Sequence, residues 1–377
     1  MVTIPYSRPS LDGNEERYLL EALSDGHLSG DGRFTKACHA RLEAMSGTPK
    51  ALLTHSCTAA LEMMGLLLDI EPGDEVIMPS YTFVSTANAF VLRGGVPVFI
   101  DVRADTINMD ERLIEQAITP RTRAIAPVHY AGVGCEMDTI LDIARAKGLA
   151  VVEDAAQGLG ATYRGKALGT IGDLGALSFH ASKNVIAGEG GALLVGRDDL
   201  RERAEVIREK GTNRSRFLRG EVDKYTWVEK GSSFLPSEIV AALLLAQLER
   251  AEAINARRVD IWNTYHRELR PLEDKGLLRR PTVPQGCSHN GHIYYLLFPT
   301  LAAQQRAREK LTAAGIAAPS HYVPLHSSPG GQRYGRVAGP MKVTDQVGEG
   351  LLRLPVHLHM TDDDQARIVD VLLSLAN

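Results

Sequence analysis

Short, nearly continuous apolar runs alternate with helix-like patterns between about residues 50 and 196. Their continuity is typical of strands that are covered on both faces, and the segments between them carry apolar residues at helical spacing, as at 59–68 and 136–147. The alternation predicts an α/β fold, with a mostly parallel seven-stranded sheet flanked by helices. The seven expected strands are 51–53, 75–78, 96–101, 124–129, 150–153, 175–179 and 192–195.

A long helix and a second region follow the predicted sheet. Ser237 is a suitable N-cap, with Glu238 in the first turn, and apolar residues at helical spacing continue toward Tyr265. Beyond them we expect a strand at 293–298 and helices at 304–314 and 362–373. The sequence therefore predicts a large domain over residues 1–249 and a small α+β domain over residues 250–377.

Composition narrows the functional classes. The chain has 377 residues, of which 44% are hydrophobic and 23% charged, as in an ordinary globular enzyme. A net charge of −4 provides no basic surface for nucleic acid. The chain lacks an apolar run of about 18 residues and a signal-peptide core at its start, so we expect a cytoplasmic protein without a membrane partner. Four widely spaced cysteines, without a Cys-x-x-Cys pair, support neither a metal site nor a disulfide framework.

Two charged residues follow predicted strands. Asp154 comes directly after the run 150–153, and Lys183 lies just beyond the run 175–179 and before the glycine-rich stretch 188–191. Ligands of parallel sheets bind beyond the carboxyl ends of the strands, so both side chains are expected in one crevice. A lysine amine forms a Schiff base with the aldehyde of pyridoxal phosphate, and an aspartate keeps its pyridine nitrogen protonated. The pair predicts a pyridoxal phosphate enzyme, although each residue alone is typical of a surface charge or a turn.

Hydroxyl groups cluster where one strand ends and a helix begins, in THSCT at 54–58. The N-terminus of a helix binds phosphate through its free N–H groups and its dipole. Simple N-capping by Ser56 or Thr58 explains the same pattern equally well. Ser178, at the end of another predicted strand, could reach the same phosphate.

Several other residues allow two interpretations. Phe83 is either a core residue or a ring stacked on the cofactor, and Gln157 is either a surface residue or a cofactor contact. His326 is either structural or a substrate contact. A loop-like basic stretch is either solvated or a clamp for a pyrophosphate; it contains Lys210, Arg214 and Arg219.

Taken together, these segments resemble the sugar aminotransferases of the DegT/DnrJ/StrS family, which are pyridoxal phosphate enzymes of the fold-type I, aspartate aminotransferase-like class. The resemblance covers essentially the whole chain, from SGDG at 29–32 to LRLP at 352–355. Its most specific parts are EDAAQ at 153–157 and SFHASKN at 178–184. It implies transfer of an amino group from L-glutamate to a dTDP-linked keto sugar, in a homodimer with shared active sites.

The resemblance also implies roles for individual residues. Lys183 would carry the cofactor and shuttle protons, while Asp154 would pair with the pyridine nitrogen. Gln157 would contact the phenolic oxygen of the cofactor, and Phe83 would stack on its ring. Phosphate contacts are implied for Cys57, Thr58 and Ser178, and for Ser233 of the partner subunit, where many relatives have asparagine. Substrate contacts are expected of Gly30, Lys210, Arg214, Arg219 and His326.

Other functions remain open at this point. Residues outside the motifs decide the sugar and the aminated carbon, so a 3-aminotransferase is an alternative. Dehydratases that resemble the family have histidine in place of the lysine, and Lys183 argues against that activity. A non-catalytic regulatory protein with this fold would not need both Lys183 and Asp154. A Rossmann-type dehydrogenase is disfavoured because no Gly-x-Gly-x-x-Gly follows the first strand.

Overall fold

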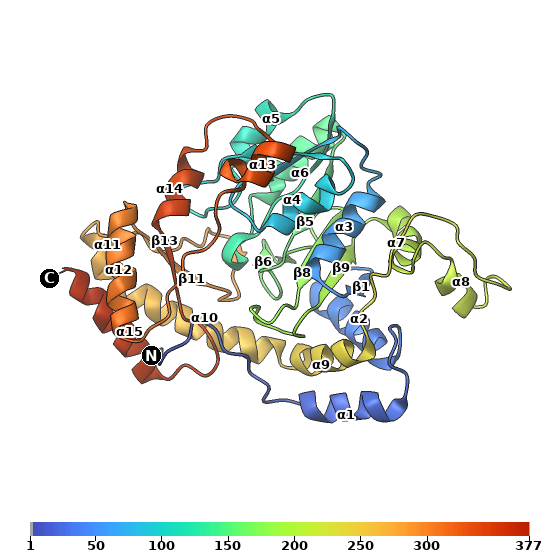
Figure 1. Ribbon diagram of the computed structural model, residues 1–377, viewed down its shortest axis with the longest axis horizontal. Coiled ribbons are helices and arrows are strands. Elements are labelled where there is room, and N and C mark those ends of the chain that lie inside the picture. Colours follow the sequence, from blue (N-terminus) through green and yellow to red (C-terminus); the bar gives the residue numbers. More distant parts are fainter. Residues whose placement is uncertain (1–2, 377) are drawn as a thin grey trace.

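The computed structural model describes residues 3–376, and a mostly parallel sheet forms its centre (Figure 1). The sheet has eight strands in the order β1-β9-β8-β5-β4-β2-β3-β12. Only β9 runs antiparallel to its neighbours, β1 and β8. The predicted α/β fold is confirmed, and each of the seven expected runs overlaps a strand, although the run 124–129 shares only its first two residues with β4. These are β1 (Ala51–Thr54), β2 (Glu75–Pro79), β3 (Val96–Ile100), β4 (Thr122–Ile125), β5 (Ala150–Asp154), β8 (Leu174–Ser178) and β9 (Gly191–Val195).

The eighth strand, β12 (Arg336–Val337), was not predicted. It comes from the C-terminal part of the chain and pairs with the edge strand β3. Two residues are too few to show a periodic pattern, so only the tertiary fold identifies this strand.

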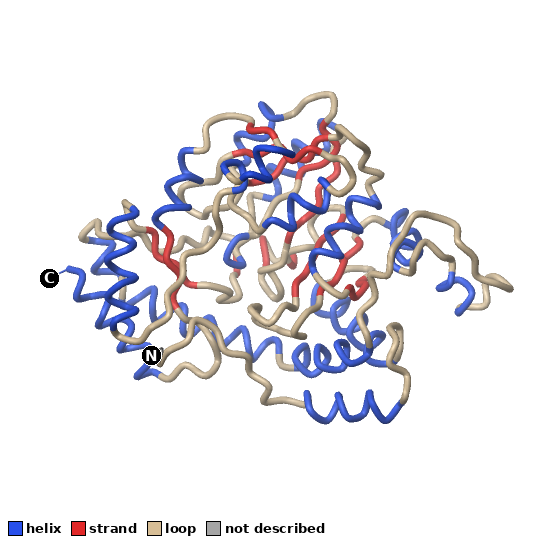
Figure 2. The backbone as a smooth tube through the Cα atoms, viewed as in Figure 1, coloured by secondary structure: helices blue, strands red, loops and turns tan. Residues whose placement is uncertain are grey.

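Helices cover both faces of the sheet (Figure 2). Successive strand residues alternate between the two hydrophobic cores, since Val151 belongs to one core and Val152 to the other. This alternation explains why the strands are apolar without interruption. One core includes residues of α2 (Arg33–Ser46), α6 (Met137–Lys147) and α9 (Glu238–Glu249), and the other includes residues of α3 (Cys57–Leu67), α4 (Val84–Val91) and α7 (Arg201–Arg208).

The long predicted helix is two helices placed end to end (Figure 1). Ser237 caps α9 as expected, accepting a hydrogen bond from Val240 N. Arg250, with φ −105° and ψ 3°, separates α9 from α10 (Ala251–Glu268). The apolar pattern continues through the break because residues on both sides of it remain buried, so periodicity alone did not reveal it.

A third core lies in the C-terminal part of the chain, between α10, a two-stranded antiparallel sheet and two further helices. The sheet consists of β11 (Tyr294–Leu297) and β13 (Leu351–Leu354), and the helices are α12 (Leu301–Ala313) and α15 (Asp362–Leu373). These elements confirm the expected strand and helices. Ile4 packs into this core, while β12 joins the large sheet, so the proposed domain boundary near residue 250 is crossed by both ends of the chain.

The remaining elements lie around these cores. Residues 209–236, which include α8, form an arm that extends away from the sheet (Figure 1). Among residues 3–376, no helix is both long enough and apolar enough to span a membrane. The other helices are α1 (Glu15–Asp25), α5 (Ile114–Ala117), α8 (Arg214–Leu218), α11 (Arg270–Asp274), α13 (Pro329–Tyr334) and α14 (Lys342–Gly350), and the other strands are β6 (Thr162–Tyr163), β7 (Lys166–Ala167) and β10 (Cys287–Ser288).

The Glu238 carboxylate joins α9 to the start of α2. It is only 2% exposed and accepts hydrogen bonds from the backbone N–H groups of Gly32 (3.1 Å), Phe34 (2.8 Å) and Thr35 (3.1 Å). It thereby satisfies N–H groups at a helix N-terminus that lacks a side-chain cap of its own. Its negative charge also suits the positive end of the helix dipole.

Glu238→Ala should lower the free energy of unfolding by about 2–4 kcal/mol, because buried N–H groups would lose their acceptor. Urea unfolding followed by circular dichroism measures the change. Glu252→Ala, which removes an exposed acid from α10, is the matched control and should stay within about 0.5 kcal/mol of wild type. Equal unfolding midpoints for Glu238→Ala and wild type would contradict this role.

Candidate active site

A cavity of about 550 Å³ lies at the carboxyl ends of β2, β4, β5 and β8, a size suited to a cofactor or small ligand. Asp154 ends β5 and Ser178 ends β8, as the sequence predicted. The structure brings together seven of the predicted site residues around this cavity. They are Cys57, Thr58, Phe83, Asp154, Gln157, Ser178 and Lys183.

The Asp154 carboxylate is fixed at the wall of the cavity. Asp154 is 5% exposed, and its Oδ2 accepts a hydrogen bond of 2.7 Å from Thr86 Oγ1. Its Oδ1 accepts from the backbone N–H of Ala156 at 3.1 Å. Thr86 is itself 2.8 Å from Thr82 Oγ1. These bonds keep an acidic group ready for a positively charged partner in the cavity.

Lys183 lies in the loop between β8 and β9. Its backbone N–H donates to His180 O at 2.9 Å, which holds the turn that carries the side chain. Burial lowers the pKa of the Lys183 amine, while the nearby Cys57 and Asp154 partly oppose this shift. A lysine with a lowered pKa supplies the neutral amine that attacks an aldehyde.

The start of α3 provides a site for an anion. Ser56 is its N-cap, and its hydroxyl accepts from Ala59 N at 3.0 Å. Capping therefore occurs, but Cys57 and Thr58 in the first turn still face the cavity. Burial raises the pKa of the Cys57 thiol well above its usual value, so this group stays neutral and does not repel a phosphate. Gly191 permits the close approach of β9, since a Cβ atom there would lie 2.4 Å from Cys57 N.

Aromatic and amide groups form another part of the wall. Phe83 is 55% exposed although it is apolar, and its ring centre lies 6.2 Å from that of Tyr322. An exposed ring at a cavity is available for stacking rather than core packing. Gln157 accepts from Ala131 N at 2.7 Å and donates to Tyr322 Oη at 3.0 Å, which fixes its orientation.

His326 does not line the cavity, although the sequence allowed a substrate contact. Its Nδ1 lies 2.7 Å from Ser80 Oγ, and its Nε2 lies 3.3 Å from Asp345. The histidine thus links the loop after β2 to the C-terminal part of the chain. Gly30 is also outside the cavity; it packs against Pro236, whose carbonyl oxygen would lie 2.6 Å from a Cβ at this position.

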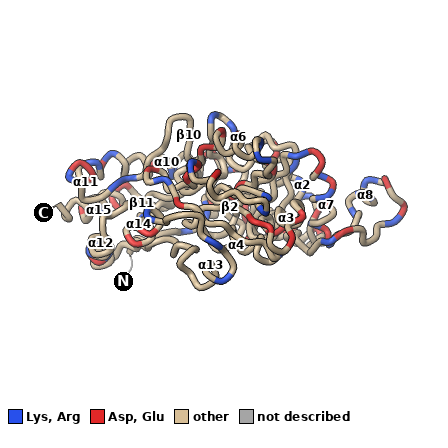
Figure 3. The backbone as a smooth tube through the Cα atoms, turned by 90° about the horizontal axis from the view of Figure 1, so that it is seen from above, with Lys and Arg blue, Asp and Glu red and all other residues tan. Residues whose placement is uncertain are grey.

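The basic residues of the arm form ion pairs instead of lining the cavity. Arg214 Nη1 and Lys210 Nζ contact Glu209 at 2.7 Å and 3.2 Å, and Arg219 contacts both Glu205 and Glu221 at 2.7 Å. Figure 3 shows acidic and basic positions side by side around α8. Ser233 is exposed on the same arm, outside the cavity of its own chain.

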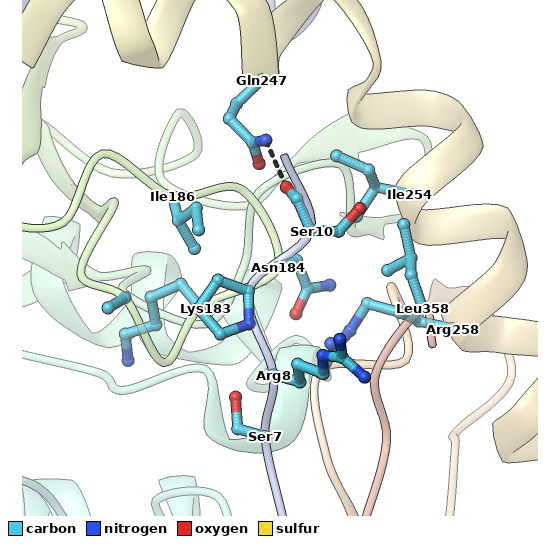
Figure 4. Close-up of a pocket in the computed structure, with 12 residues that line it drawn as sticks. Ser7, Arg8, Ser10, Lys183, Asn184, Ile186, Gln247, Ile254, Arg258 and Leu358 are labelled. Carbon is cyan, nitrogen blue, oxygen red and sulfur yellow. Dashed lines mark hydrogen bonds between the residues drawn. The ribbon is translucent and has the colours of Figure 1, made fainter. Parts of the chain in front are cut away.

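Lys183 also borders a second cavity, of only about 10 Å³ (Figure 4). Arg8 and Ser10 of the N-terminal segment lie between Lys183 and Arg258 of α10 in this view. Gln247 Nε2 donates to the carbonyl oxygen of Ser10 at 2.8 Å. The space suits at most a water molecule, so a cofactor bound to Lys183 must occupy the large cavity.

Sequence reasoning missed the residues that the N-terminal segment and the C-terminal part of the chain bring to the large cavity: Tyr6, His292, His321, Tyr322 and Arg353. His321 and Tyr322 are stacked with ring centres 3.6 Å apart. Burial lowers the pKa of His321 to about 2, so this histidine is neutral. Periodicity does not identify such residues, because they reach the site only through the tertiary fold. The motif LRLP at 352–355 was the feature of the sequence from which Arg353 could have been identified.

The groups around the cavity fit pyridoxal phosphate. Asp154 suits the protonated pyridine nitrogen, the start of α3 with its hydroxyl groups suits the phosphate, and the Lys183 amine suits the aldehyde. The exposed ring of Phe83 can cover a flat cofactor.

Comparisons with known proteins agree with this fit. The sequence profile of the DegT/DnrJ/EryC1/StrS aminotransferase family matches residues 9–373. The GDP-perosamine synthase of Caulobacter vibrioides is 34% identical over 375 residues, which cover 98% of this chain and 97% of the relative. The crystal structure of the aminotransferase TlmJ from Streptoalloteichus hindustanus is similar with a TM-score of 0.90 and 28% identity, covering 100% of this chain and 99% of that one.

A structure in the pyridoxal phosphate form is similar as well. Spr1654 of Streptococcus pneumoniae in its PLP form has a TM-score of 0.90 and 28% identity, over 99% of this chain and 98% of that one. The cofactor of this protein is pyridoxal phosphate, and the chain belongs to the DegT/DnrJ/EryC1/StrS aminotransferase family.

Proposed function

We propose that the protein transfers the amino group of L-glutamate to C4 of dTDP-4-keto-6-deoxy-D-glucose. The products are dTDP-4-amino-4,6-dideoxy-D-galactose and 2-oxoglutarate. One observation carries the amino transfer: Asp154 and Lys183 line the same cavity as the start of α3. The choice of sugar is supported by a resemblance of segments 79–94, 128–132 and 208–215 to dTDP-4-amino-4,6-dideoxygalactose transaminase, an enzyme of the enterobacterial common antigen pathway.

We assign a different role in the reaction to each of several residues of the cavity. Bound pyridoxal phosphate supplies an electron sink. Asp154 would stabilise the positive charge on its ring nitrogen, while Phe83 and Gln157 would orient the ring. Lys183 would take a proton from the α-carbon of glutamate and deliver it to the C4′ carbon of the cofactor. The same amine moves a proton in the opposite direction when the keto sugar accepts the amino group.

A homodimer is the proposed functional unit. The arm carries exposed apolar side chains, including Leu218 at 62% and Trp227 at 77%, which favour a protein partner. Ser233 of the partner subunit would then contact the phosphate. A pyrophosphate clamp by Lys210, Arg214 and Arg219 would require these side chains to leave their acidic partners, so we assign them a weaker role in substrate binding.

Lys183 should be the residue that forms the covalent bond to the cofactor. Incubation with pyridoxal phosphate, borohydride reduction and peptide mass mapping should find the adduct on Lys183 in wild type and no adduct in Lys183→Ala. Lys36→Ala, which removes an exposed lysine from α2, should behave like wild type. Because the neutral amine reacts, the labelling rate should fall as the pH drops below the lowered pKa of Lys183. The same amount of adduct in Lys183→Ala as in wild type would contradict the proposal.

Asp154→Asn should lower kcat by about 10²–10³-fold, because it removes a preorganised charge opposite the ring nitrogen. Stopped-flow absorbance of the reaction with glutamate measures the effect, and near-UV circular dichroism checks the fold. Asp142→Asn, at an exposed position on α6, is the control and should retain the wild-type rate. A kcat within threefold of wild type would show that Asp154 does not face the ring.

The substrate is tested by incubating the enzyme with glutamate and dTDP-4-keto-6-deoxyglucose, followed by NMR of the product sugar. The proposal predicts an axial amine at C4. The GDP-linked keto sugar is tested in parallel, because one relative is a GDP-perosamine synthase. An equatorial amine, an amine at C3 or a preference for the GDP sugar would contradict the assigned substrate while leaving amino transfer intact.

A further inference from the structure

A buried amide side chain holds the residue that directly follows Lys183. Asn184 is 9% exposed, and its Nδ2 donates hydrogen bonds to Asn255 Oδ1 at 2.8 Å and to the carbonyl oxygen of Asn290 at 2.9 Å. Its Oδ1 lies 3.0 Å from Nδ1 of His292. Both ends of the Asn184 amide are therefore engaged, by α10 and by the segment that precedes β11.

Backbone carbonyl groups fix the orientation of these amides. A carbonyl oxygen only accepts hydrogen bonds, so the Asn184 atom that faces Asn290 O is the nitrogen. In the same way, Asn255 donates its Nδ2 to Leu159 O at 3.0 Å, which leaves its Oδ1 to face Asn184. The Oδ1 atom of Asn184 is then the atom that faces His292, and an amide oxygen only accepts. His292 therefore carries its proton on Nδ1.

His292 is an uncharged residue of the large cavity. It is 6% exposed and lines this cavity together with Lys183. Burial is the main cause that lowers the pKa of His292 well below its usual value, and the charges of Lys183 and Arg258 add to this shift. A neutral imidazole with its proton on Nδ1 has a lone pair on Nε2. His292 can therefore accept a hydrogen bond through Nε2 but cannot donate one there.

The loop that carries Lys183 is fastened near its base by backbone hydrogen bonds, such as the bond of 2.8 Å from Ala181 N to Gly188 O. Farther along the loop, the side chain of Asn184 ties the chain to α10 and to the segment before β11. Val185 is also buried, but apolar contacts have no preferred direction. The hydrogen bonds of Asn184 therefore fix the direction of the backbone beside Lys183.

We propose that Asn184 is a positioning residue with two effects. It holds the turn that carries Lys183, and it sets His292 to the tautomer with the proton on Nδ1, which leaves an uncharged acceptor in the cavity that Lys183 lines. A displacement of about 1 Å at a reacting group can slow a reaction by about 10²-fold, so a fixed turn favours the covalent bond between Lys183 and the cofactor. This inference rests on the proposed role of Lys183 and adds the residues that hold it in place.

NMR of the holoenzyme labelled with ¹⁵N-histidine reads the tautomer of His292 directly. The signals that are missing from the spectrum of His292→Asn identify this residue. At pH 7 they should show a neutral ring with its proton on Nδ1. Asn184→Ser should abolish this preference, because the acceptor of that proton is lost. A proton on Nε2 in wild type would contradict the inference.

The rate of covalent bond formation tests the effect on Lys183. Full-length protein freed of cofactor is mixed with increasing concentrations of pyridoxal phosphate, and the absorbance gives the maximal rate and the half-saturating concentration. Asn184→Ser should lower the maximal rate by about 10–100-fold. It should leave the half-saturating concentration unchanged, because the phosphate site proposed at α3 is intact. Asn263→Ser, at an exposed position on α10, is the control and should match wild type.

Two variants of His292 separate positioning from packing. An asparagine side chain places its amide nitrogen near the position of Nδ1, whereas glutamine places it near Nε2. His292→Asn can therefore still donate to Asn184 and should keep the wild-type maximal rate. His292→Gln loses this donor and should lower the maximal rate as Asn184→Ser does. If Asn184→Ser does not fold, judged by near-UV circular dichroism, these two variants decide.

Two outcomes would overturn the positioning role while leaving the role of Lys183 intact. One is a wild-type maximal rate in folded Asn184→Ser, and the other is an equal maximal rate in His292→Asn and His292→Gln. Wild-type protein that forms no covalent bond with pyridoxal phosphate would instead overturn the proposed role of Lys183, and the positioning role with it.

Discussion

The hydrogen-bonded pairing of β5 with β8 is the constraint on which the active site depends. Asp154 is paired with Ala176, so its carboxylate lies beside the strand that continues into Ser178 and the Lys183 loop. Neighbouring strands are only about 4.8 Å apart, so one small cavity can receive both the acid and the amine. Burial of both sheet faces stabilises this pairing, because a shift of one residue would exchange the two hydrophobic cores.

The walls of the large cavity come from two parts of the chain. The end of β5, the loop after β8 and the start of α3 provide Asp154, Lys183 and Thr58, all from the large sheet region. Tyr6, His321 and Arg353 come from the N-terminal segment and the C-terminal part of the chain and form another part of the wall. Ile4 packs into the C-terminal core, which links these walls to each other.

The fold was largely predictable because its strands are short, apolar and buried on both faces. The apolar runs identified all seven main strands, and the positions of Asp154 and Lys183 after two of them predicted the cofactor. The periodicity of apolar residues did not reveal the break at Arg250, because buried residues continue at helical spacing from one helix into the next. Strand β12 was too short to carry a pattern. The sequence identified Glu238 only as an acid in the first turn of α9. It did not predict that the Glu238 carboxylate accepts hydrogen bonds from the first N–H groups of α2.

The site was less predictable where contacts between distant segments, and not the local sequence, determine the position of a residue. Phe83 was ambiguous in the sequence, and its 55% exposure at the cavity identifies it as a wall residue. His326 lies in a conspicuous motif, yet it bonds to Ser80 outside the cavity. The basic stretch around Arg214 resembled an anion clamp, but its charges are met by acids of the same arm. Ion pairs and packing between different segments determine the positions of these side chains, and the local sequence pattern does not predict such contacts.

The most direct test is ¹⁵N NMR of the protein loaded with pyridoxal phosphate labelled at the ring nitrogen. If Asp154 and Lys183 hold opposite ends of one ring, the nitrogen signal at pH 8 should be that of a protonated pyridine in wild type and of an unprotonated one in Asp154→Asn. A neutral ring nitrogen in the wild-type protein would contradict the account.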